Sequence, residues 1–349
     1  MNVIVTTVIR NTVIGEQISG RIIKLDWEKG IILKEKEIVS PLYPQSNKNP
    51  RGGLRGGRGI KVWEDRYYVA NYDSIYIYDK DLNIIKSLSH KIIADIHEID
   101  INSKGIWVSC SRSDLVVKLD FDGKLIDHWH ISYSKDLQDI LKIKAKPISL
   151  NIDYRKEGIP SYMDQTHLNS VQYYQDDSLI IDLGLVKPNT VDQVLKKEIK
   201  KYINKLEKIN ILNGSNIISK AISKIFNTEK YSYIIKLNLY DKTEFSVMVK
   251  YPANRPNHNG LLLSNNKVVL AAESQNLIIF SSDNGKILRK INVPGNWLRG
   301  LAEINEEKLL VGKGPAGVVE VNYHKNEIIK ELQLSTNPHE SIHGIAIEE

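Results

Sequence analysis

Short runs of hydrophobic residues, separated by polar turns, extend through almost the whole chain. Three stretches share one order of signals: an apolar strand, a polar turn, a second apolar strand, a tight turn and a third strand. They are YYVANYDSIYIYDKDLNIIKSL, GIWVSCSRSDLVVKLDFDGKLIDHW and VVLAAESQNLIIFSSDNGKILRKI. Each is preceded by another short strand, and the DG and NG dipeptides favour hairpin turns. Four antiparallel strands per unit indicate the blade of a β-propeller.

The unit recurs with a period of about 40 residues, which is typical of a propeller blade. The innermost strands of the units are predicted to begin at Arg58, His97, His167, His258, Arg299 and His343. The spacings between these positions are 39, 70, 91, 41 and 44 residues. Three of the spacings fit one blade each, and the two long ones each contain an insertion.

The last unit has a single strand at the C-terminus, and the N-terminus supplies three strands without a first one. We therefore predict an all-β fold with one domain over residues 1–349. It is a six-bladed β-propeller, closed by N- and C-terminal strands in one blade and carrying a helical insertion. Such closure would remove exposed sheet edges.

Three insertions are predicted to cover one face of the propeller. The loop SPLYPQSNKNPRGGLRGG and the segment 131–163 each enter an innermost strand, and the segment 187–230 falls between the second and third strands of the third blade. These connections share a face, where long loops often form lids or binding elements. Residues 190–212 have the apolar spacing of an amphipathic helix. We predict a helical lid, with a partner-docking or membrane-surface helix as the alternatives.

Composition and charge narrow the classes of partner. The net charge is +6, but the segment 190–230 holds nine Lys and four acidic residues, so +5 of it is local. A nucleic-acid interface needs a basic face, so we predict no nucleic-acid partner. No run approaches ~18 apolar residues, and the N-terminus lacks a basic signal-peptide region. With Cys110 as the one cysteine, we expect no disulfide, a buried thiol and a cytoplasmic location.

The six residues that open the innermost strands are expected to converge on the propeller axis. We call Arg58, His97, His167, His258, Arg299 and His343 the axial ring. A purely structural repeat would place apolar or small residues there, so this ring predicts a functional site. The remaining histidines do not share the repeat position and are expected at the surface or in loops; they are His90, His128, His130, His324 and His339.

The first interpretation of the ring is a metal-dependent enzyme. The four ligands of one divalent transition metal, with iron first among the candidates, would be His97, His167, His258 and His343. The carboxylates that could orient these ligands are Glu98, Asp164, Asp182 and Glu273. Arg58 and Arg299 would bind an anionic small-molecule substrate beside the metal. The metal would activate that substrate or O₂, in an oxygenase or lyase type of reaction.

The second interpretation is an enzyme without a metal. One axial histidine acts as nucleophile or general base, Asn169 donates a hydrogen bond, and the arginines stabilise a transferring sulfuryl group or another anion. The catalytic candidates are His167, Asn169, Arg58 and Arg299. Two arginines would repel a dication unless an anion lies between them, which favours this interpretation, whereas four histidines favour the metal. The third interpretation is a non-enzymatic ligand-binding or scaffold propeller.

Several stretches in the second half of the chain resemble an uncharacterised bacterial propeller family with HLN, proline–histidine and RGLA motifs. The matching words are THLNSVQYY, RPNHNGLLLSNNKVVLAAESQNLIIFSSDNGKI and GNWLRGLAEINEEKLLVGKG. The resemblance implies a propeller but no activity. This chain departs from the family in having PNHNG and the helical insertion.

The predicted axial site is also similar to two characterised families. Arylsulfate sulfotransferases are six-bladed and have axial histidines, an arginine and an H-x-N motif similar to His167–Asn169. That likeness implies covalent uptake of a sulfuryl group by a histidine. Carotenoid cleavage oxygenases are more distantly similar, with four axial histidines on iron but seven blades. Both comparisons concern the composition of the site, and a shared fold does not fix function.

Overall fold

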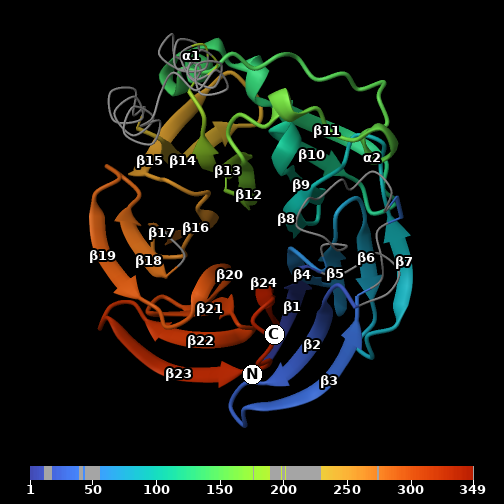
Figure 1. Cartoon of the computed structure of the whole chain (residues 1–349), viewed down its shortest axis with the longest axis vertical. Helices are drawn as coiled ribbons and strands as arrows, with labels where there is room; N and C mark the ends of the chain where they lie inside the picture. Colours follow the sequence, from blue (N-terminus) through green and yellow to red (C-terminus); the bar gives the residue numbers. More distant parts are fainter. Residues whose placement is uncertain are drawn as a thin grey trace, which may run out of the picture.

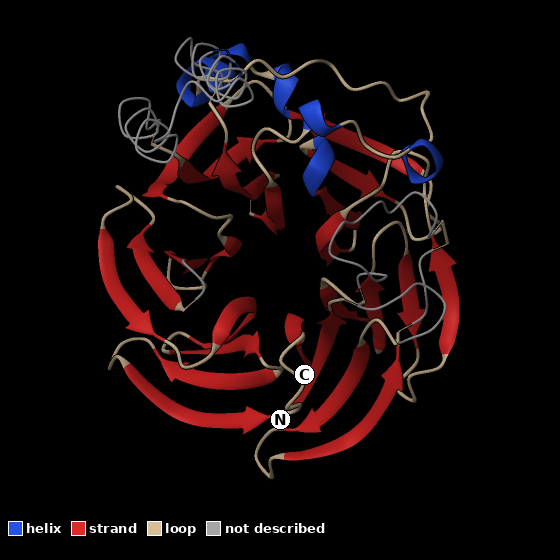
Figure 2. Ribbon diagram, viewed as in Figure 1, coloured by secondary structure: helices blue, strands red, loops and turns tan. Residues whose placement is uncertain are grey.

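The computed structural model confirms the six-bladed β-propeller. Six four-stranded antiparallel sheets are arranged in a ring, with the innermost strand of each nearest the central axis (Figures 1 and 2). The structure describes residues 1–11, 18–38, 42–43, 56–175, 177–188, 198, 201, 229–272 and 275–348. We number the blades from one to six in the order of their innermost strands along the chain.

The bounds of the strands follow blade by blade, from the innermost strand outward. Blade one contains β4 (Ile60–Trp63), β5 (Arg66–Ala70), β6 (Ile75–Tyr78) and β7 (Ile84–Leu88). Blade two contains β8 (Ile96–Asn102), β9 (Gly105–Cys110), β10 (Leu115–Leu119) and β11 (Leu125–His130). Blade three contains β12 (Leu168–Tyr174), β13 (Ser178–Val186), β14 (Tyr231–Asn238) and β15 (Phe245–Pro252).

The other three blades complete the ring. Blade four contains β16 (His258–Leu262), β17 (Lys267–Ala272), β18 (Asn276–Ser281) and β19 (Ile287–Asn292). Blade five contains β20 (Asn296–Asn305), β21 (Lys308–Gly314), β22 (Gly317–Asn322) and β23 (Glu327–Gln333). Blade six contains β24 (Glu340–Glu348), β1 (Asn2–Ile9), β2 (Arg21–Asp26) and β3 (Ile31–Glu37).

Blade six closes the ring in the predicted way, by joining the two ends of the chain. The C-terminal strand β24 pairs antiparallel with β1, with Val3 opposite Ile347 and Val5 opposite Ile345. Both chain ends lie in this blade (Figure 1). Backbone hydrogen bonds within this one sheet therefore join the two ends of the chain and close the ring of blades.

The second and third strands of the blades form the apolar core, and the outermost strands face solvent. All nine residues of β13 are buried, whereas six of the seven residues of β3 are exposed. The core clusters join strands of neighbouring blades, since β-branched and aromatic side chains fill the space between stacked sheets. Cys110 is buried at the end of β9, which confirms its predicted place in the core.

Short helices occupy the connection between blades two and three. They are the 3-10 turn η3 (Ile131–Tyr133), helices α1 (Lys135–Leu141) and α2 (Tyr154–Glu157), and the 3-10 turn η4 (Ser161–Met163). Another turn, η2 (Ser111–Ser113), follows β9. Within the described residues, no helix is long and apolar enough to cross a membrane.

The segment 187–230 lies between β13 and β14, the second and third strands of blade three. The predicted helix over 190–212 falls outside the described residues except for Glu198 and Lys201. Most of the predicted loop before Arg58 also falls outside them. The lid, membrane-surface and partner-docking roles therefore stay predictions, as does the cytoplasmic location.

Candidate active site

Five of the six innermost strands, all except β4, carry a β-bulge or similar irregularity near their starts. In β8, Ile96 pairs with Cys110 and Glu98 pairs with Ser109, so His97 is skipped in the register. The residues skipped near the starts of the other bulged strands are Asn169 in β12, Asn259 and Gly260 in β16, Trp297, Leu298 and Gly300 in β20, and His343 in β24. A bulge leaves a residue out of the ladder and re-aims its side chain, here at the axis.

The bulges show that the six predicted ring residues are not strictly equivalent. His97 and His343 occupy the bulge itself, and Asn169 takes the corresponding place in β12. His258 and Arg299 instead come just before the bulge of their own strands. His167 comes two residues before its bulge, with a left-handed backbone (φ 49°). The register thus assigns Asn169, rather than His167, the place of a ring member in β12.

Three of the histidines form one cluster across blades two, three and four. The ring centroids of His97 and His167 are 5.2 Å apart, and those of His97 and His258 are 6.2 Å apart. The centroids of His167 and His258 are separated by 6.3 Å. In Figure 1, strands β8, β12 and β16 border the central opening from three sides. The predicted convergence therefore holds for these three imidazoles.

The amide of Asn169 joins two of these imidazoles and fixes their protonation. Its Oδ1 lies 3.0 Å from His97 Nδ1, and its Nδ2 lies 2.6 Å from His258 Nδ1. Nδ2 also donates to the carbonyl oxygen of Asn257 at 2.6 Å, which settles the amide orientation because a carbonyl only accepts. His97 is then protonated on Nδ1 and has its lone pair on Nε2. His258 accepts through Nδ1 and carries its proton on Nε2.

The fourth histidine is paired with the second ring arginine. Arg299 Nη1 lies 3.3 Å from Nδ1 and 3.2 Å from Nε2 of His343. Burial lowers the pKa of His258 and of His343 well below the usual value, and the Arg299 charge lowers both further. Both rings keep partial contact with the channel, yet protein atoms replace most of their water. These two rings are neutral at neutral pH, and the charge beside them is that of the Arg299 guanidinium.

Arg58 is bound into the wall of the channel. Its guanidinium forms an ion pair with Asp95 at 3.1 Å and donates to the carbonyl oxygen of Ile96. The side chains of Arg58 and Asp95 are only 3% and 1% exposed. The Arg58 carbonyl accepts a hydrogen bond from Thr6 Oγ1 at 2.6 Å. Arg58 thus links blades six, one and two, and its charge reaches the site through space, where it helps to lower the pKa of His343.

The predicted carboxylates differ in what they contact. Asp164 Oδ1 lies 3.6 Å from His167 Nδ1, and its Oδ2 binds Lys187 Nζ at 2.6 Å. Burial opposes ionisation of Asp164, but the contacts with His167 and Lys187 prevail and lower its pKa. Glu98 accepts from Asn259 Nδ2 at 2.8 Å. Glu273 lies outside the described residues. Of the four, Asp164 is the one seen beside a ring histidine.

Asp182 is fully buried behind the ring. Its Oδ2 accepts from the Gly260 amide at 3.1 Å, and its Oδ1 has no hydrogen-bond partner within the described part of the chain. Burial raises the pKa of Asp182 to about 7, and the Gly260 hydrogen bond opposes that rise only in part. An unfolded aspartate titrates near 4. The folded state therefore loses stability relative to the unfolded state as the pH rises from about 4 to about 7. In this range the Asp182 carboxyl is protonated in the folded chain but ionised in the unfolded one.

We predict that Asp182→Asn removes this pH dependence. The free energy of unfolding of the variant minus that of the parent should increase by about 2–4 kcal/mol from about pH 5 to about pH 8. Urea unfolding of both proteins at the two pH values measures the shift. Asn284→Asp, at an exposed turn position, serves as a control for the change of residue type. If variant and parent differ in free energy of unfolding by the same amount at both pH values, the prediction is contradicted.

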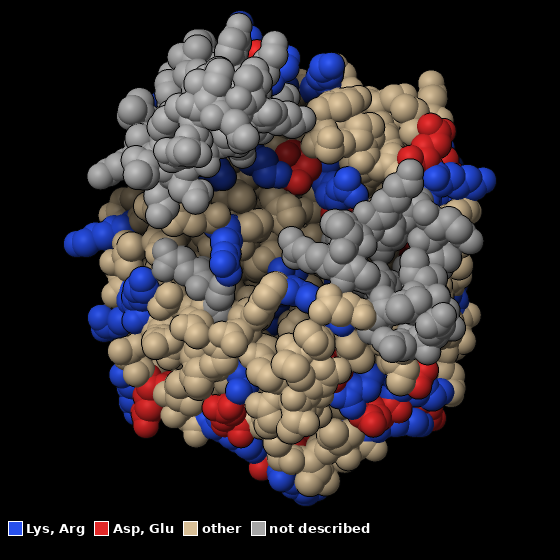
Figure 3. All heavy atoms as spheres, viewed as in Figure 1, with Lys and Arg blue, Asp and Glu red and all other residues tan. Residues whose placement is uncertain are grey.

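Arg10 was missed by the sequence analysis and belongs to the site. It follows β1, and its guanidinium carbon lies 3.4 Å above the ring of Trp297, which is 43% exposed. Its charge contributes to the lowered pKa of both His258 and His343. On the face shown in Figure 3, Lys and Arg atoms gather around the central hollow. The signal available in the sequence was an arginine that ends the apolar strand of the closing blade.

One of the remaining histidines departs from its expected surface position. His130 is 2% exposed, and its Nδ1 accepts from the Ser132 amide at the start of η3. Burial lowers the pKa of His130 to about 4. The expectation of a surface or loop role is therefore wrong for His130, which ends a buried strand and caps the turn that follows. The apolar residues around it gave no sign of this in the sequence.

The four-histidine arrangement does not fit a metal centre as these side chains lie. Across the described residues, no three or more His, Cys, Asp or Glu side chains form a group that could hold a metal ion. A neutral imidazole has one nitrogen lone pair, and His258 uses it to accept from Asn169. Arg299 places a cation against His343. The metal, with iron as first candidate, stays a prediction, and no reaction step is derived through it.

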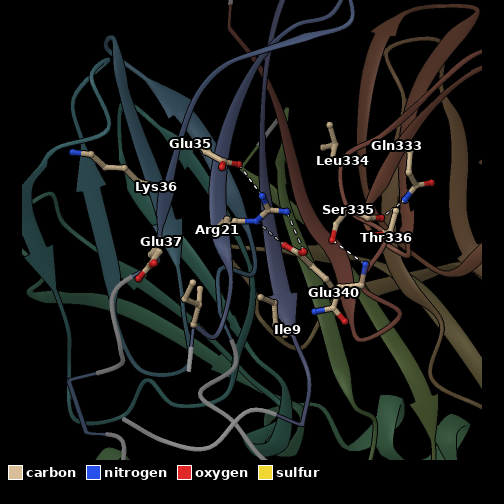
Figure 4. A pocket seen from close by; sticks show the side chains of 12 residues that line it. Ile9, Arg21, Glu35, Lys36, Glu37, Gln333, Leu334, Ser335, Thr336 and Glu340 are labelled. Atoms are coloured by element: carbon tan, nitrogen blue, oxygen red, sulfur yellow. Dashed lines mark hydrogen bonds and ion pairs between the residues drawn. The ribbon is translucent and has the colours of Figure 1, made fainter. Parts of the chain in front are cut away.

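A second hollow lies away from the axis, between blades five and six (Figure 4). This groove has a volume of about 830 Å³ and is lined in part by Arg21, Glu35 and Glu340. Arg21 binds Glu340 at 2.9 Å and Glu35 at 2.8 Å. These charges compensate one another, and the groove contains no histidine. The axis therefore remains the candidate active site.

Comparison with solved structures supports the propeller fold. No model of a protein family matches the chain, and no curated protein sequence does. A protein of unknown function from Bacteroides caccae is 7% identical with a TM-score of 0.55, covering 99% of this chain and 97% of the other. A structure of the nidogen/laminin complex is 8% identical with a TM-score of 0.56 and the same coverage. The motif-level resemblance and the likeness to sulfotransferases remain predictions.

Proposed function

We propose that this protein is a small-molecule enzyme with its active site at the propeller axis, which transfers a sulfuryl or related anionic group through His97. The observation that carries the proposal is the Asn169 amide between two histidines. It holds the His97 lone pair on Nε2 and the His258 proton on Nε2. One ring is thus oriented as a nucleophile and its neighbour as a hydrogen-bond donor.

The charges around this pair suit an anionic substrate. Arg299 and Arg10 contribute positive potential at His258, while Arg58 is balanced by Asp95. Guanidiniums in a partly dehydrated site stabilise the oxygens of a transferring sulfuryl or phosphoryl group. The neutral imidazoles of His258 and His343 add no further positive charge. This arrangement supports group transfer over a dication in the same place.

In the first half-reaction, Nε2 of His97 attacks the sulfur of an organic sulfate. The N–S bond forms as the S–O bond to the leaving group breaks, and the S–O electron pair leaves with that oxygen. Asn169 Oδ1 accepts from Nδ1–H and stabilises the positive charge that develops on His97. His167, whose Nδ1 lies 3.6 Å from Asp164 Oδ1, is assigned as the general acid that donates a proton to the leaving oxygen.

In the second half-reaction, an acceptor hydroxyl attacks the same sulfur. The N–S electron pair returns to Nε2 of His97, and His167 takes the proton of the hydroxyl. Atoms and charges then balance over one cycle: the sulfuryl group has moved between two oxygens and the enzyme is restored. His258 donates a hydrogen bond throughout and transfers no proton.

Covalent labelling tests this function directly. We expect protein incubated with nitrophenyl sulfate, and no acceptor, to gain the mass of one sulfuryl group. The label should lie in the tryptic peptide 92–104, whose one histidine is His97. His97→Ala should lose the label and slow transfer by about 10²–10⁴-fold, and His324→Ala, at an exposed outer position, should retain both. The same labelling experiment is repeated with a phosphoryl donor in place of the organic sulfate.

The same assay separates the alternatives. Transfer should be unaffected by a chelator or by added iron, manganese, zinc or copper. An activity that depends on one of these metals would instead support the four-histidine centre. Anion binding at the axis with no label and no turnover on either donor would overturn the proposal in favour of a non-enzymatic binding protein.

A further inference from the structure

A second layer of polar side chains lies directly beneath the histidine cluster. Glu98 follows His97 along β8, and Asn259 follows His258 along β16. The innermost strands all run along the channel, from the face with their entry loops toward the opposite face of the propeller. Glu98 and Asn259 therefore stand one residue deeper in the channel than the two histidines. The bulges let consecutive residues of one strand both reach the axis.

Hydrogen bonds join this layer across three blades. Asn259 Nδ2 donates to Glu98 Oε2 at 2.8 Å, and Asn259 Oδ1 accepts from the Gly300 amide at 3.0 Å. The second bond fixes the amide orientation, since a backbone N–H needs an oxygen acceptor. Glu98 belongs to blade two and Asn259 to blade four, so the first bond joins two blades that are not neighbours in the ring. Figure 1 shows β8 and β16 facing each other over the central opening.

The layer is tightly enclosed on its other sides. A Cβ atom on Gly59 of blade one would lie 2.1 Å from Glu98 Oε1, so only glycine fits beside the carboxyl group. The Ile99 amide donates to that same oxygen at 3.2 Å. Asn259 has a left-handed backbone with φ 53°, a conformation that asparagine tolerates better than most residues.

We propose that Glu98 is a positioning residue which, through Asn259 and the Gly300 amide, fixes His258 and Arg299 relative to His97. Each residue of the layer directly follows one of these three along its own strand, so a bond in the layer becomes a constraint on the active site. The layer also forms the floor of the site, and substrate enters from the face with the entry loops. This inference rests on the proposed location of the active site at the axis.

A double-mutant cycle tests the coupling. We expect Glu98→Gln and Asn259→Ala each to lower kcat by about 10–100-fold with little change in KM. The glutamine amide cannot accept from both Asn259 Nδ2 and the Ile99 amide, so it loses one of the two bonds. The double variant should lose no more than the larger single loss, because both changes break one connection. Glu306→Gln, at an exposed turn, is the matched control.

A second readout makes the test independent of turnover. In protein with isotope-labelled histidine, both variants should shift the imidazole nitrogen signals of His97 and His258, while the His324 signals stay in place. Glu98→Asp, which keeps the carboxyl group but shortens the side chain, replaces Glu98→Gln if the latter is not recovered folded. Additive losses of kcat, or unchanged His97 and His258 signals, would overturn the inference. Shifted signals without group transfer would overturn the proposed function alone.

Discussion

Replacing Arg58 with methionine is expected to lower the free energy of unfolding by about 3–5 kcal/mol. The ion pair of Arg58 and Asp95 is almost fully buried, at 3% and 1% side-chain exposure. Removing the cation leaves the Asp95 carboxylate buried without its ion-pair partner, and a charge in that position costs several kcal/mol. Methionine fills most of the space of the arginine stem, so the expected loss comes from charge rather than from a cavity.

Urea unfolding of a short variant series measures this effect. Adding Asp95→Asn to Arg58→Met should recover at least about 2 kcal/mol, because the buried carboxylate is removed with its partner. Lys80→Met breaks an exposed pair with Asp65, whose side chain is 81% exposed, and should change stability by less than about 0.5 kcal/mol. A loss below about 1 kcal/mol in Arg58→Met would show that the pair does not hold blades one and two together.

The buried ion pair of Arg58 and Asp95 illustrates what could and could not be predicted from the sequence. The blade count followed from local signals, namely four apolar runs per unit, turn dipeptides between them and a last unit divided between the chain ends. Those signals depend on nearest-neighbour hydrogen bonding and burial, which one chain displays directly. The partner of Arg58 is Asp95 of the next blade, and a contact of this kind leaves no periodic trace.

The bulges explain why the six ring residues were predicted to be equivalent although their registers differ. A bulge adds one residue to a strand without changing its apolar pattern, so a repeat alignment tolerates an offset of one or two positions. His97 and His343 therefore looked equivalent to His167, whereas the structure gives their place in β12 to Asn169. The sequence analysis had named Asn169 as a donor. Its amide both donates to His258 and accepts from His97.

We expect Asn169→Asp to reduce group transfer by about 10²–10³-fold in a protein that remains folded. A carboxylate oxygen in place of Nδ2 would face the Asn257 carbonyl and the Nδ1 lone pair of His258, both at the 2.6 Å now spanned by donated hydrogen bonds. It would repel the carbonyl and draw a proton onto His258 Nδ1. The pKa of His258 should then rise, and its donor geometry toward substrate should change.

Histidine nitrogen spectra distinguish this effect from simple loss of packing. In the parent protein the signals should report His97 protonated on Nδ1 and His258 protonated on Nε2. In Asn169→Asp, His258 should gain a proton on Nδ1 while His97 keeps its own, because the acceptor oxygen toward His97 is retained. Asn284→Asp, at an exposed turn where either side chain can accept from Lys286, should leave the spectra and the transfer rate unchanged. If the opposite tautomers appear in the parent protein, His97 is not the nucleophile, because its Nδ1 would then carry the lone pair.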